Sequence, residues 1–353
     1  MTPETPRVIV AVITGERGQR EIVRPLAAVG ERCVVLDWEE FAARVCCPHL
    51  RFPFALQRLL RTHPGSVVFT DMNSAFLAVI VVACSLLGMP VVLRLRGDPF
   101  AETRDQLRFH WRNRAWLSLI RAGIAWLLDR PLFARVSRFV PVSDWVVRRL
   151  HIEARSAVVR IPVEVDGFPI RSHETAGRLR LLAVTNFNYP QKVAPLGRFL
   201  DEHRDFLRAQ EIAVTIAGAG IALESFRAEH GGQAALLGFV SDVAALYAAH
   251  DVFIHFSDLD AFPYVVLEAQ ASGLPVLVNR ACGMLEQVEH DRTGLIVDLA
   301  DRSQIEAHLR SLSEPAIRTR LGTAARAHVA ATYSLQEIGR QLLDRGLPSR
   351  QPR

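Results

Sequence analysis

Residues 252–278 read VFIHFSDLDAFPYVVLEAQASGLPVLV, and this stretch decides the fold. Two short apolar runs, Val252–His255 and Pro275–Val278, indicate buried strands, and Val265–Ala271 between them indicates a helix. A strand, a crossover helix and a second strand form the unit from which parallel sheets are built. The stretch therefore predicts a parallel sheet with helices on its faces.

The same alternation runs through the rest of the chain in two series. We expect helices at Glu21–Val29 and Ala75–Leu87, and a break between the series around 166–177, where charged and turn-forming residues interrupt the pattern. The other predicted strands are Val8–Ile13, Cys33–Leu36, Val67–Thr70, Val91–Leu95, Leu179–Val184, Ala213–Ala217 and Ala235–Leu237. The predicted fold class is α/β, with two doubly wound domains that face each other across a cleft.

Length and composition agree with two packed domains. The chain has 353 residues, of which 50% are hydrophobic and 22% are charged. Its five cysteines are odd in number and lack zinc-site spacing. The apolar run 75–89 is shorter than the roughly 18–20 residues that a membrane span needs, and no basic leader precedes the first strand. We therefore expect a cytoplasmic protein.

The stretch from Ser257 to Asp298 resembles the family-4 retaining glycosyltransferases, which have the GT-B fold. Weaker support comes from residues 140–150, 158–166, 246–254 and 333–343. The motif positions that match in order are Ser257, Phe262, Pro263, Leu267, Glu268, Ala269, Gly273, Pro275, Val276, Gly283, Glu286 and Gly294. The resemblance implies an acceptor-binding domain over residues 1–166 and a nucleotide-sugar-binding domain over 167–332, both Rossmann-like. It also implies that residues 333–353 form a helix and tail that pack back on the N-terminal domain.

Two carboxylates of this stretch are candidate donor-binding groups. Asp260 lies in a strand-end loop and Glu268 in the helix beyond it, so that they can accept hydrogen bonds from different hydroxyls of one nucleotide sugar. The resemblance implies that Asp260, as a catalytic residue, holds the transferred sugar and that Glu268 holds the ribose. Asp260 and Ala261 stand where the family usually has Glu and Gly. Backbone N–H groups at the start of this helix favour phosphate, and we place Ala261, Phe262 and Pro263 in the donor site.

Lys192 is the only lysine of the chain and follows the first predicted strand of the second domain. A compact ammonium in such a loop is a common phosphate partner. The resemblance implies that Lys192 binds the donor diphosphate, and we count it among the catalytic residues. The family's accompanying arginine is replaced by Phe187. We expect Arg94 or Arg96 to compensate, or to pair with Asp98 or Glu102, and Arg96 is our third catalytic candidate.

Glycine-containing loops complete the predicted donor site. By resemblance, Gly218 and Gly220 lie beside the nucleotide, and residues 238–240 (Gly238, Phe239 and Val240) contact the base through backbone groups. Gly15, in the loop Thr14–Gln19 after the first strand, is expected where a donor phosphate or the acceptor enters.

Three other functions compete with glycosyl transfer. A nicotinamide dehydrogenase is disfavoured because TGERGQRE lacks the spacing of its glycine motif. A catalytically silent nucleotide-sugar-binding subunit and a GT-B nucleotide-sugar epimerase remain open. We expect no cofactor and no metal, because the cysteines lack the spacing of a zinc site.

The segment Arg104–Arg130 is the candidate acceptor-side surface. Residues 104–149 contain ten arginines and three aspartates, a net charge of +7, whereas the whole chain carries +5. The remainder is slightly acidic, which argues against nucleic acid as a partner. A helix that mixes arginines with tryptophans suits an anionic membrane surface, although a domain helix whose tryptophans face the core is the alternative. With a membrane surface, the acceptor is a lipid-linked glycan and the protein is peripheral on the inner face of the cell membrane.

Overall fold

The computed structural model describes residues 8–71, 74–112, 116–170 and 178–347. They form two compact units. The first consists of the chain up to Pro162 together with the segment from Leu335 onward, and the second is Val163–Ser334. The N-terminal part of the first unit thus ends at Pro162, four residues before the boundary expected from the sequence.

The first unit is built on five parallel strands in the order β2-β1-β3-β4-β5. The strands are β1 (Ile9–Ile13), β2 (Cys33–Asp37), β3 (Val67–Thr70), β4 (Val91–Leu95) and β5 (Arg138–Pro141). β1, β3 and β4 are buried along their whole length, as their mostly apolar sequences predict for a sheet covered on both faces. The order reverses between β1 and β3, so that the carboxyl ends of these two strands flank the switch point where such sheets bind ligands.

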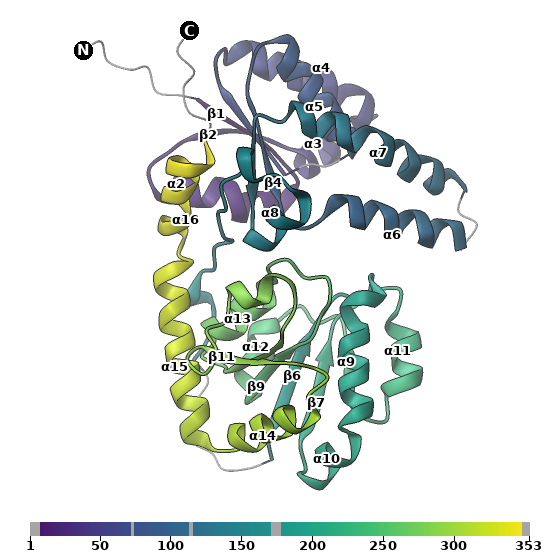
Figure 1. Cartoon of the computed structure of the whole chain (residues 1–353). Helices are drawn as coiled ribbons and strands as arrows, with labels where there is room; N and C mark the ends of the chain where they lie inside the picture. The colour runs from purple at the N-terminus through teal and green to yellow at the C-terminus, as the bar shows by residue number, and fades with distance from the viewer. Residues whose placement is uncertain (1–7, 72–73, 113–115, 171–177, 348–353) are drawn as a thin grey trace. The chain divides into compact units, whose positions relative to one another are not determined.

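The helices of the first unit connect these strands and include the C-terminal segment (Figure 1). They are α1 (Gly15–Gly18), a π-helical turn (Gln19–Val23), α2 (Arg24–Ala28), α3 (Trp38–Arg44), α4 (Pro48–Thr62), α5 (Ser74–Leu86), α6 (Pro99–Arg112), α7 (Trp116–Arg135), α8 (Asp144–Leu150) and α16 (Leu335–Gln341).

The second unit contains six parallel strands in the order β11-β10-β9-β6-β7-β8. The strands are β6 (Arg180–Val184), β7 (Ala213–Ala217), β8 (Ala235–Gly238), β9 (Val252–His255), β10 (Val276–Asn279) and β11 (Gly294–Val297). This is the doubly wound dinucleotide-binding order, and its switch point lies between β6 and β9, which pair directly through Leu181 and Val252.

Helices cover both faces of the second sheet. They are α9 (Pro190–Glu202), α10 (Arg204–Ala209), α11 (Leu223–His230), α12 (Val243–Ala249), α13 (Tyr264–Ala271), α14 (Arg302–Leu312) and α15 (Pro315–Thr332). Alternate residues of one strand enter different cores: Leu181 joins the cluster with α9, α10, α11 and α14, whereas Leu182 joins the cluster with α12 and α13. The two-residue period of the strand produces this division.

The fold confirms the predicted doubly wound α/β class and corrects it locally. β5 and β11 are strands that the sequence patterns did not predict. Residues 104–130, expected as one helix, are divided between α6 and α7, which pack against each other. Residues 113–115, between α6 and α7 in the chain, lie outside the described residues. The segment Thr14–Gln19, expected as a loop, begins a helix at Gly15.

The C-terminal helix α16 packs against α2 in the first unit. Ile338 and Leu342 enter the same core as Ile22 and Leu26. A Cβ atom on Gly339 would lie 2.0 Å from the carbonyl oxygen of Pro25. Only glycine permits this close approach of the two helices.

Replacing Gly339 by valine should therefore destabilise the first unit. Overpacking of this kind costs about 1–3 kcal/mol, and each kcal/mol lowers the melting temperature by about 2–4 °C in a unit of this size. All five tryptophans lie between Trp38 and Trp145, so tryptophan fluorescence follows the unfolding of this unit. Gly123→Ala is the matched control, because nothing lies within 4 Å of its added Cβ. Equal melting curves for Gly339→Val and wild type would contradict the packing assigned to α16.

Candidate active site

The loop that carries Asp260 is held by the backbone of its own unit. Asn279 clamps its first residue: the Ser257 N–H donates to Asn279 Oδ1 (3.0 Å), and Asn279 Nδ2 donates to the Ser257 carbonyl oxygen (3.3 Å). The Gly283 N–H donates to the Asp260 carbonyl oxygen (3.3 Å), and Gln287 Nε2 donates to that of Pro263 (3.0 Å). These contacts fix the loop backbone, so that the position of the Asp260 carboxylate depends on its side-chain rotamer.

The Asp260 carboxylate lies between two nitrogen donors. Lys192 Nζ is 2.6 Å from Asp260 Oδ1, and His255 Nε2 is 3.1 Å from Asp260 Oδ2. Burial alone raises the pKa of Asp260, but the hydrogen bond and charge of His255, followed by those of Lys192, outweigh it and hold the pKa well below its usual range. Asp260 is therefore an ionised acceptor throughout the physiological pH range.

Lys192 and Asp260 come from the two strands at the switch point of the second sheet. Lys192 lies in the first turn of α9, after β6, and its ammonium is 5.7 Å from the centre of the Tyr189 ring. His255 is the last residue of β9 and is 5% exposed. The structure thus brings together two predicted residues and a third, His255, that the sequence motifs did not single out. Its signal in the sequence was a histidine that ends an otherwise apolar strand, five residues before Asp260.

The remaining donor-site residues of the motif are mostly packed inside the second unit. Ala261 and Phe262 are 4% and 6% exposed, and Phe262 contacts the Tyr333 ring edge to face. Pro263 is buried at the start of α13. Little of these three residues is therefore accessible to a ligand. Glu268, on α13, is partly exposed, and its Oε2 accepts a hydrogen bond from the Tyr247 hydroxyl (3.2 Å).

The glycines after β7 are required by a close approach of two loops. A Cβ on Gly218 would lie 1.9 Å from the carbonyl oxygen of Thr185, and one on Gly220 would lie 2.4 Å from the Asn188 nitrogen. Both glycines have positive φ angles, +147° and +148°. They pack the loop after β7 against the loop after β6, which leads into Lys192. Phe187 lies in that second loop, fully buried, with its ring 5.3 Å from that of Phe226.

The end of β8 differs from the rest of the predicted donor site. Gly238 has a φ of +75°, and its carbonyl oxygen accepts a hydrogen bond from the Gly218 N–H (2.8 Å). Phe239 is 79% exposed and Val240 is half-buried. An exposed phenyl ring beside a bent backbone offers a flat surface to a base.

Arg96 belongs to a buried charge cluster of the first unit. Its Nε is 2.7 Å from Glu21 Oε1, and its Nη2 is 2.8 Å from Asp71 Oδ2. Arg94 is buried, with its Nε 2.9 Å from Glu21 Oε2 and its other nitrogens bonded to carbonyl oxygens of the backbone. Burial alone raises the pKa of Glu21, but Arg96 and Arg94 together lower it, whereas the pKa of Asp71 stays raised because burial dominates there.

These contacts correct the ion pairs expected for the two arginines. Asp98, named as a partner, pairs instead with Arg149 (3.0 Å), and the side chain of Glu102 lies outside the described part of the chain. Arg94 is in β4 and Arg96 follows the strand directly, and both side chains contact Glu21. Both nitrogens that Arg96 presents there are thereby engaged by carboxylates.

Gly15 lies at the carboxyl end of β1, as expected, but the carboxylates of Asp37 and Glu39 lie next to it. Its N–H donates to Asp37 Oδ1 (3.0 Å), and a Cβ atom there would lie 2.1 Å from Glu39 Oε2. Thr14 donates through its N–H to Asp71 Oδ1 (3.0 Å). Carboxylates therefore surround the position at which a phosphate was expected.

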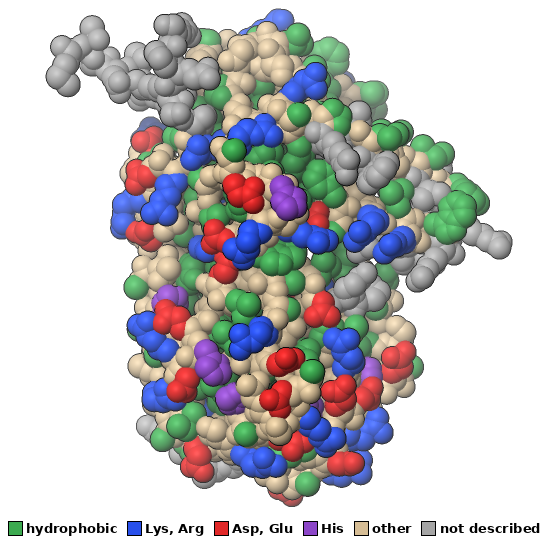
Figure 2. All heavy atoms as spheres, viewed as in Figure 1, with side chains coloured by type: hydrophobic (Ala, Val, Ile, Leu, Met, Phe, Trp, Pro, Cys, Tyr) green, Lys and Arg blue, Asp and Glu red, His purple; other side chains and the backbone are tan. Residues whose placement is uncertain are grey.

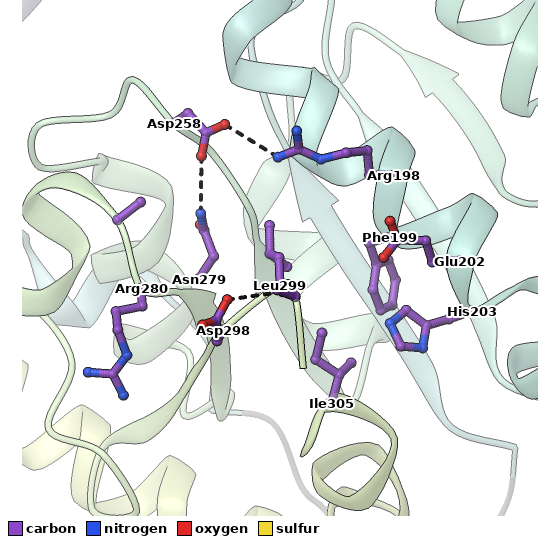
Figure 3. Close-up of a pocket in the computed structure, with 12 residues that line it drawn as sticks. Arg198, Phe199, Glu202, His203, Asp258, Asn279, Arg280, Asp298, Leu299 and Ile305 are labelled. Carbon is purple, nitrogen blue, oxygen red and sulfur yellow. Dashed lines mark hydrogen bonds and ion pairs between the residues drawn. The ribbon is translucent and has the colours of Figure 1, made fainter. Parts of the chain in front are cut away.

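A cavity of about 390 Å³ lies in the second unit, between α9 and α14 and next to the loops that follow β9, β10 and β11 (Figure 3). Asp258 accepts hydrogen bonds from Arg198 Nη2 and Asn279 Nδ2, both at 3.5 Å. Asn279 thus contacts both this cavity and the Asp260 loop. Among the described residues, no cluster of three His, Cys, Asp or Glu side chains is placed to hold a metal ion.

Comparison with known proteins agrees with this geometry. Residues 178–314 match the model of the family described as "Glycosyl transferases group 1". A viral relative from an isolate of Victoria, Australia, described as "Putative glycosyltransferase ORF31", is 28% identical over 82% of this chain and 84% of its own length. A GDP-mannose-dependent monoacylated alpha-(1-6)-phosphatidylinositol monomannoside mannosyltransferase of Corynebacterium glutamicum is 37% identical over 24% of this chain, and the match spans only 22% of that relative.

Solved structures share the fold over nearly the whole chain. A glycosyltransferase of Rickettsia africae superposes with a TM-score of 0.68 at 14% identity, covering 96% of this chain and 98% of its own. Anabaena HepE in complex with UDP superposes with a TM-score of 0.66 at 15% identity, covering 96% and 99%. The two doubly wound sheets thus have the GT-B fold of these solved glycosyltransferases, and residues 178–314 are similar to the group 1 glycosyltransferases.

Proposed function

We propose that this protein transfers a sugar from a UDP- or GDP-sugar to a hydroxyl group with retention of anomeric configuration and without a metal ion. The observation that carries the proposal is the contact between Lys192 and Asp260 at the switch point of the second sheet. An ammonium and a carboxylate at 2.6 Å are the two groups that a nucleotide sugar needs: one for the diphosphate and one for sugar hydroxyls. HepE with bound UDP and the GDP-mannose-dependent relative support a nucleotide-sugar donor.

In the proposed reaction the bond between the anomeric carbon and the diphosphate oxygen breaks. The charge that develops on the departing diphosphate is stabilised by Lys192 and by the backbone N–H groups at the start of α13. The acceptor oxygen bonds to the anomeric carbon on the face that the diphosphate leaves, and the departing phosphate oxygen can take the acceptor's proton. Asp260 orients the sugar and Glu268 the ribose. Arg96 is not assigned to the donor, because Glu21 and Asp71 engage its guanidinium.

Lys192→Ala should weaken nucleoside diphosphate binding about 10- to 100-fold, because a hydrogen bond to a charged group contributes about 1.5–3 kcal/mol. Calorimetry with UDP and GDP measures this. Arg198→Ala is the matched control on the same helix, since Arg198 pairs with the exposed Asp258 at 3.5 Å and exposed pairs contribute little. Because no other lysine exists, an amine-selective label followed by mass spectrometry should also report protection of Lys192 by bound nucleotide. An unchanged dissociation constant in Lys192→Ala would remove the residue from the site.

The chemical outcome separates an enzyme from the two alternatives. With a panel of donors and acceptors, we expect an α-linked product from an α-linked donor, seen by NMR, and activity within about twofold of normal in excess chelator, since Lys192 replaces the cation. A protein that binds nucleotide but leaves donor and acceptor unchanged is a silent binding subunit. Conversion of the donor sugar into its epimer, with no acceptor present, identifies an epimerase. Loss of activity in chelator contradicts metal independence.

The acceptor side of the proposal rests on α6 and α7. Four residues on one face of α7, which we call the α7 apolar row, are 53–68% exposed: Trp116, Ile120, Ile124 and Leu127. Their spacing of four, four and three residues makes a continuous stripe. Trp111, at the end of α6, is 65% exposed and meets Trp116 edge to face at 5.9 Å. The alternative, in which the tryptophans of this segment face the core, is wrong for Trp111 and Trp116.

Basic side chains accompany the apolar row. Arg104 and Arg108 are exposed on α6, and Figure 2 shows hydrophobic and basic side chains next to one another on the part of the surface formed by α6 and α7. Tryptophan with arginine is the composition that binds at the headgroup level of anionic lipids. We therefore infer that the α7 apolar row docks on an anionic membrane surface, that the acceptor is a lipid-linked glycan of a cell-envelope polysaccharide or glycolipid, and that the protein works on the cytoplasmic face. No described helix meets the length and apolarity needed to span a bilayer.

Co-sedimentation with vesicles tests this surface. The protein should bind vesicles that contain about 30% anionic lipid at low salt, and less strongly as salt screens the arginines. Changing Ile120 and Ile124 together to serine should lower the partition coefficient at least tenfold, because burying each side chain contributes about 1.5–3 kcal/mol. Phe54→Ser, at a residue that is 73% exposed on α4, is the control and should bind as wild type does. Absence of binding to anionic vesicles at low salt would leave a water-soluble acceptor.

A further inference from the structure

His255 holds Asp260 from a direction different from that of Lys192. Its imidazole projects from the end of β9, the strand that leads into the Asp260 loop, whereas Lys192 reaches the carboxylate from α9. Each occupies one carboxylate oxygen: Lys192 Nζ is at 2.6 Å from Oδ1 and His255 Nε2 at 3.1 Å from Oδ2. A carboxylate has about four lone-pair positions, so both contacts leave acceptor capacity for sugar hydroxyls.

The two partners differ in mobility. Lys192 carries its charge on a flexible four-carbon stem, and its side chain is 23% exposed. His255 has a rigid ring, is 5% exposed, and lies nearly parallel to the Phe253 ring, with an interplanar angle of 11°. A bound diphosphate carries more negative charge than one carboxylate and therefore attracts the ammonium more strongly. The histidine has no comparable freedom to move.

We propose that His255 is a positioning residue that keeps the Asp260 carboxylate aimed at the donor sugar when Lys192 turns to the diphosphate. This inference rests on the proposed function of the same site. The loop backbone is already fixed by Asn279, Gly283 and Gln287, so the carboxylate rotamer is what remains to be set. For the Nε2 contact His255 must carry its hydrogen on Nε2, because the ionised Asp260 can only accept.

The position also accounts for the aspartate at residue 260. A carboxylate on a single methylene has a short reach, and a donor at the end of β9 fixes which way that short side chain points. Without His255, departure of Lys192 would leave Asp260 free to turn toward water. The contribution of His255 should therefore appear only with ligands that carry the sugar.

Paired ligands test the proposal by calorimetry: UDP with UDP-glucose, or GDP with GDP-mannose, whichever pair raises the melting temperature of the wild-type protein. For His255→Ala we expect a dissociation constant for the nucleoside diphosphate within about twofold of wild type. For the nucleotide sugar we expect a rise of about tenfold or more, with a matching fall in kcat, as loss of a hydrogen bond to a charged group implies. His255→Gln, whose amide N–H has a similar reach, should restore most of the loss.

His250→Ala is the control for removing a buried imidazole from the second unit, since His250 Nδ1 lies 2.7 Å from the Leu246 carbonyl oxygen. This variant should change the dissociation constants of the nucleoside diphosphate and the nucleotide sugar by the same factor. The positioning role is overturned if His255→Ala weakens the binding of both ligands equally, or of neither. It is also overturned if the glutamine variant binds the nucleotide sugar no better than the alanine variant does. If His255→Ala does not fold, the glutamine variant is compared with wild type by the same pair of ligands. A wild-type protein that binds neither pair refutes the proposed function instead.

Discussion

The Lys192 ammonium and the Asp260 carboxylate approach to 2.6 Å because the second sheet reverses its strand order between β6 and β9. The loop after β6 and the loop after β9 leave neighbouring strands at the same edge and then diverge toward helices on opposite faces of the sheet. Such a reversal opens a crevice at the strand ends. The pairing of Leu181 with Val252 in the two strands sets the distance between residues that lie 68 positions apart in the chain.

Charge is compensated differently in the two units. In the first, the side chains of Glu21, Asp71 and Arg94 are buried and Arg96, which is 25% exposed, contacts both carboxylates, so that removing either arginine would leave a buried carboxylate without one of its cations. Arg96 is therefore part of the support for the carboxyl ends of β1, β3 and β4. In the second, Lys192 and Asp260 remain partly accessible, 23% and 13%, so each can exchange its partner for a ligand group. Arg96 is held in place by two carboxylates, whereas the Lys192 ammonium contacts the single carboxylate of Asp260.

Glycine positions show how the loops around this ion pair are held. Gly218 and Gly220 allow the loop after β7 to touch the loop after β6, and a Cβ on Gly283 would lie 1.4 Å from the carbonyl oxygen of Ala261. The close approach of two backbone segments therefore explains why glycine is required at these motif positions. The same contacts restrict the backbone conformation of the Asp260 loop. Its charged side chains can still change their rotamers.

The sequence alone determined the doubly wound α/β class, most of the strands, the family resemblance and the candidate residues Lys192 and Asp260. These follow from local information: apolar runs, helical spacing, and residue types at strand ends. The strands β5 and β11 and the two helices α6 and α7 within residues 104–130 were not predicted. Only the tertiary structure decided that Arg96 is engaged by Glu21 and Asp71 and that His255 holds Asp260. Those partners are set by which strands become neighbours in the sheet, and strand order arises from packing between segments distant in the chain.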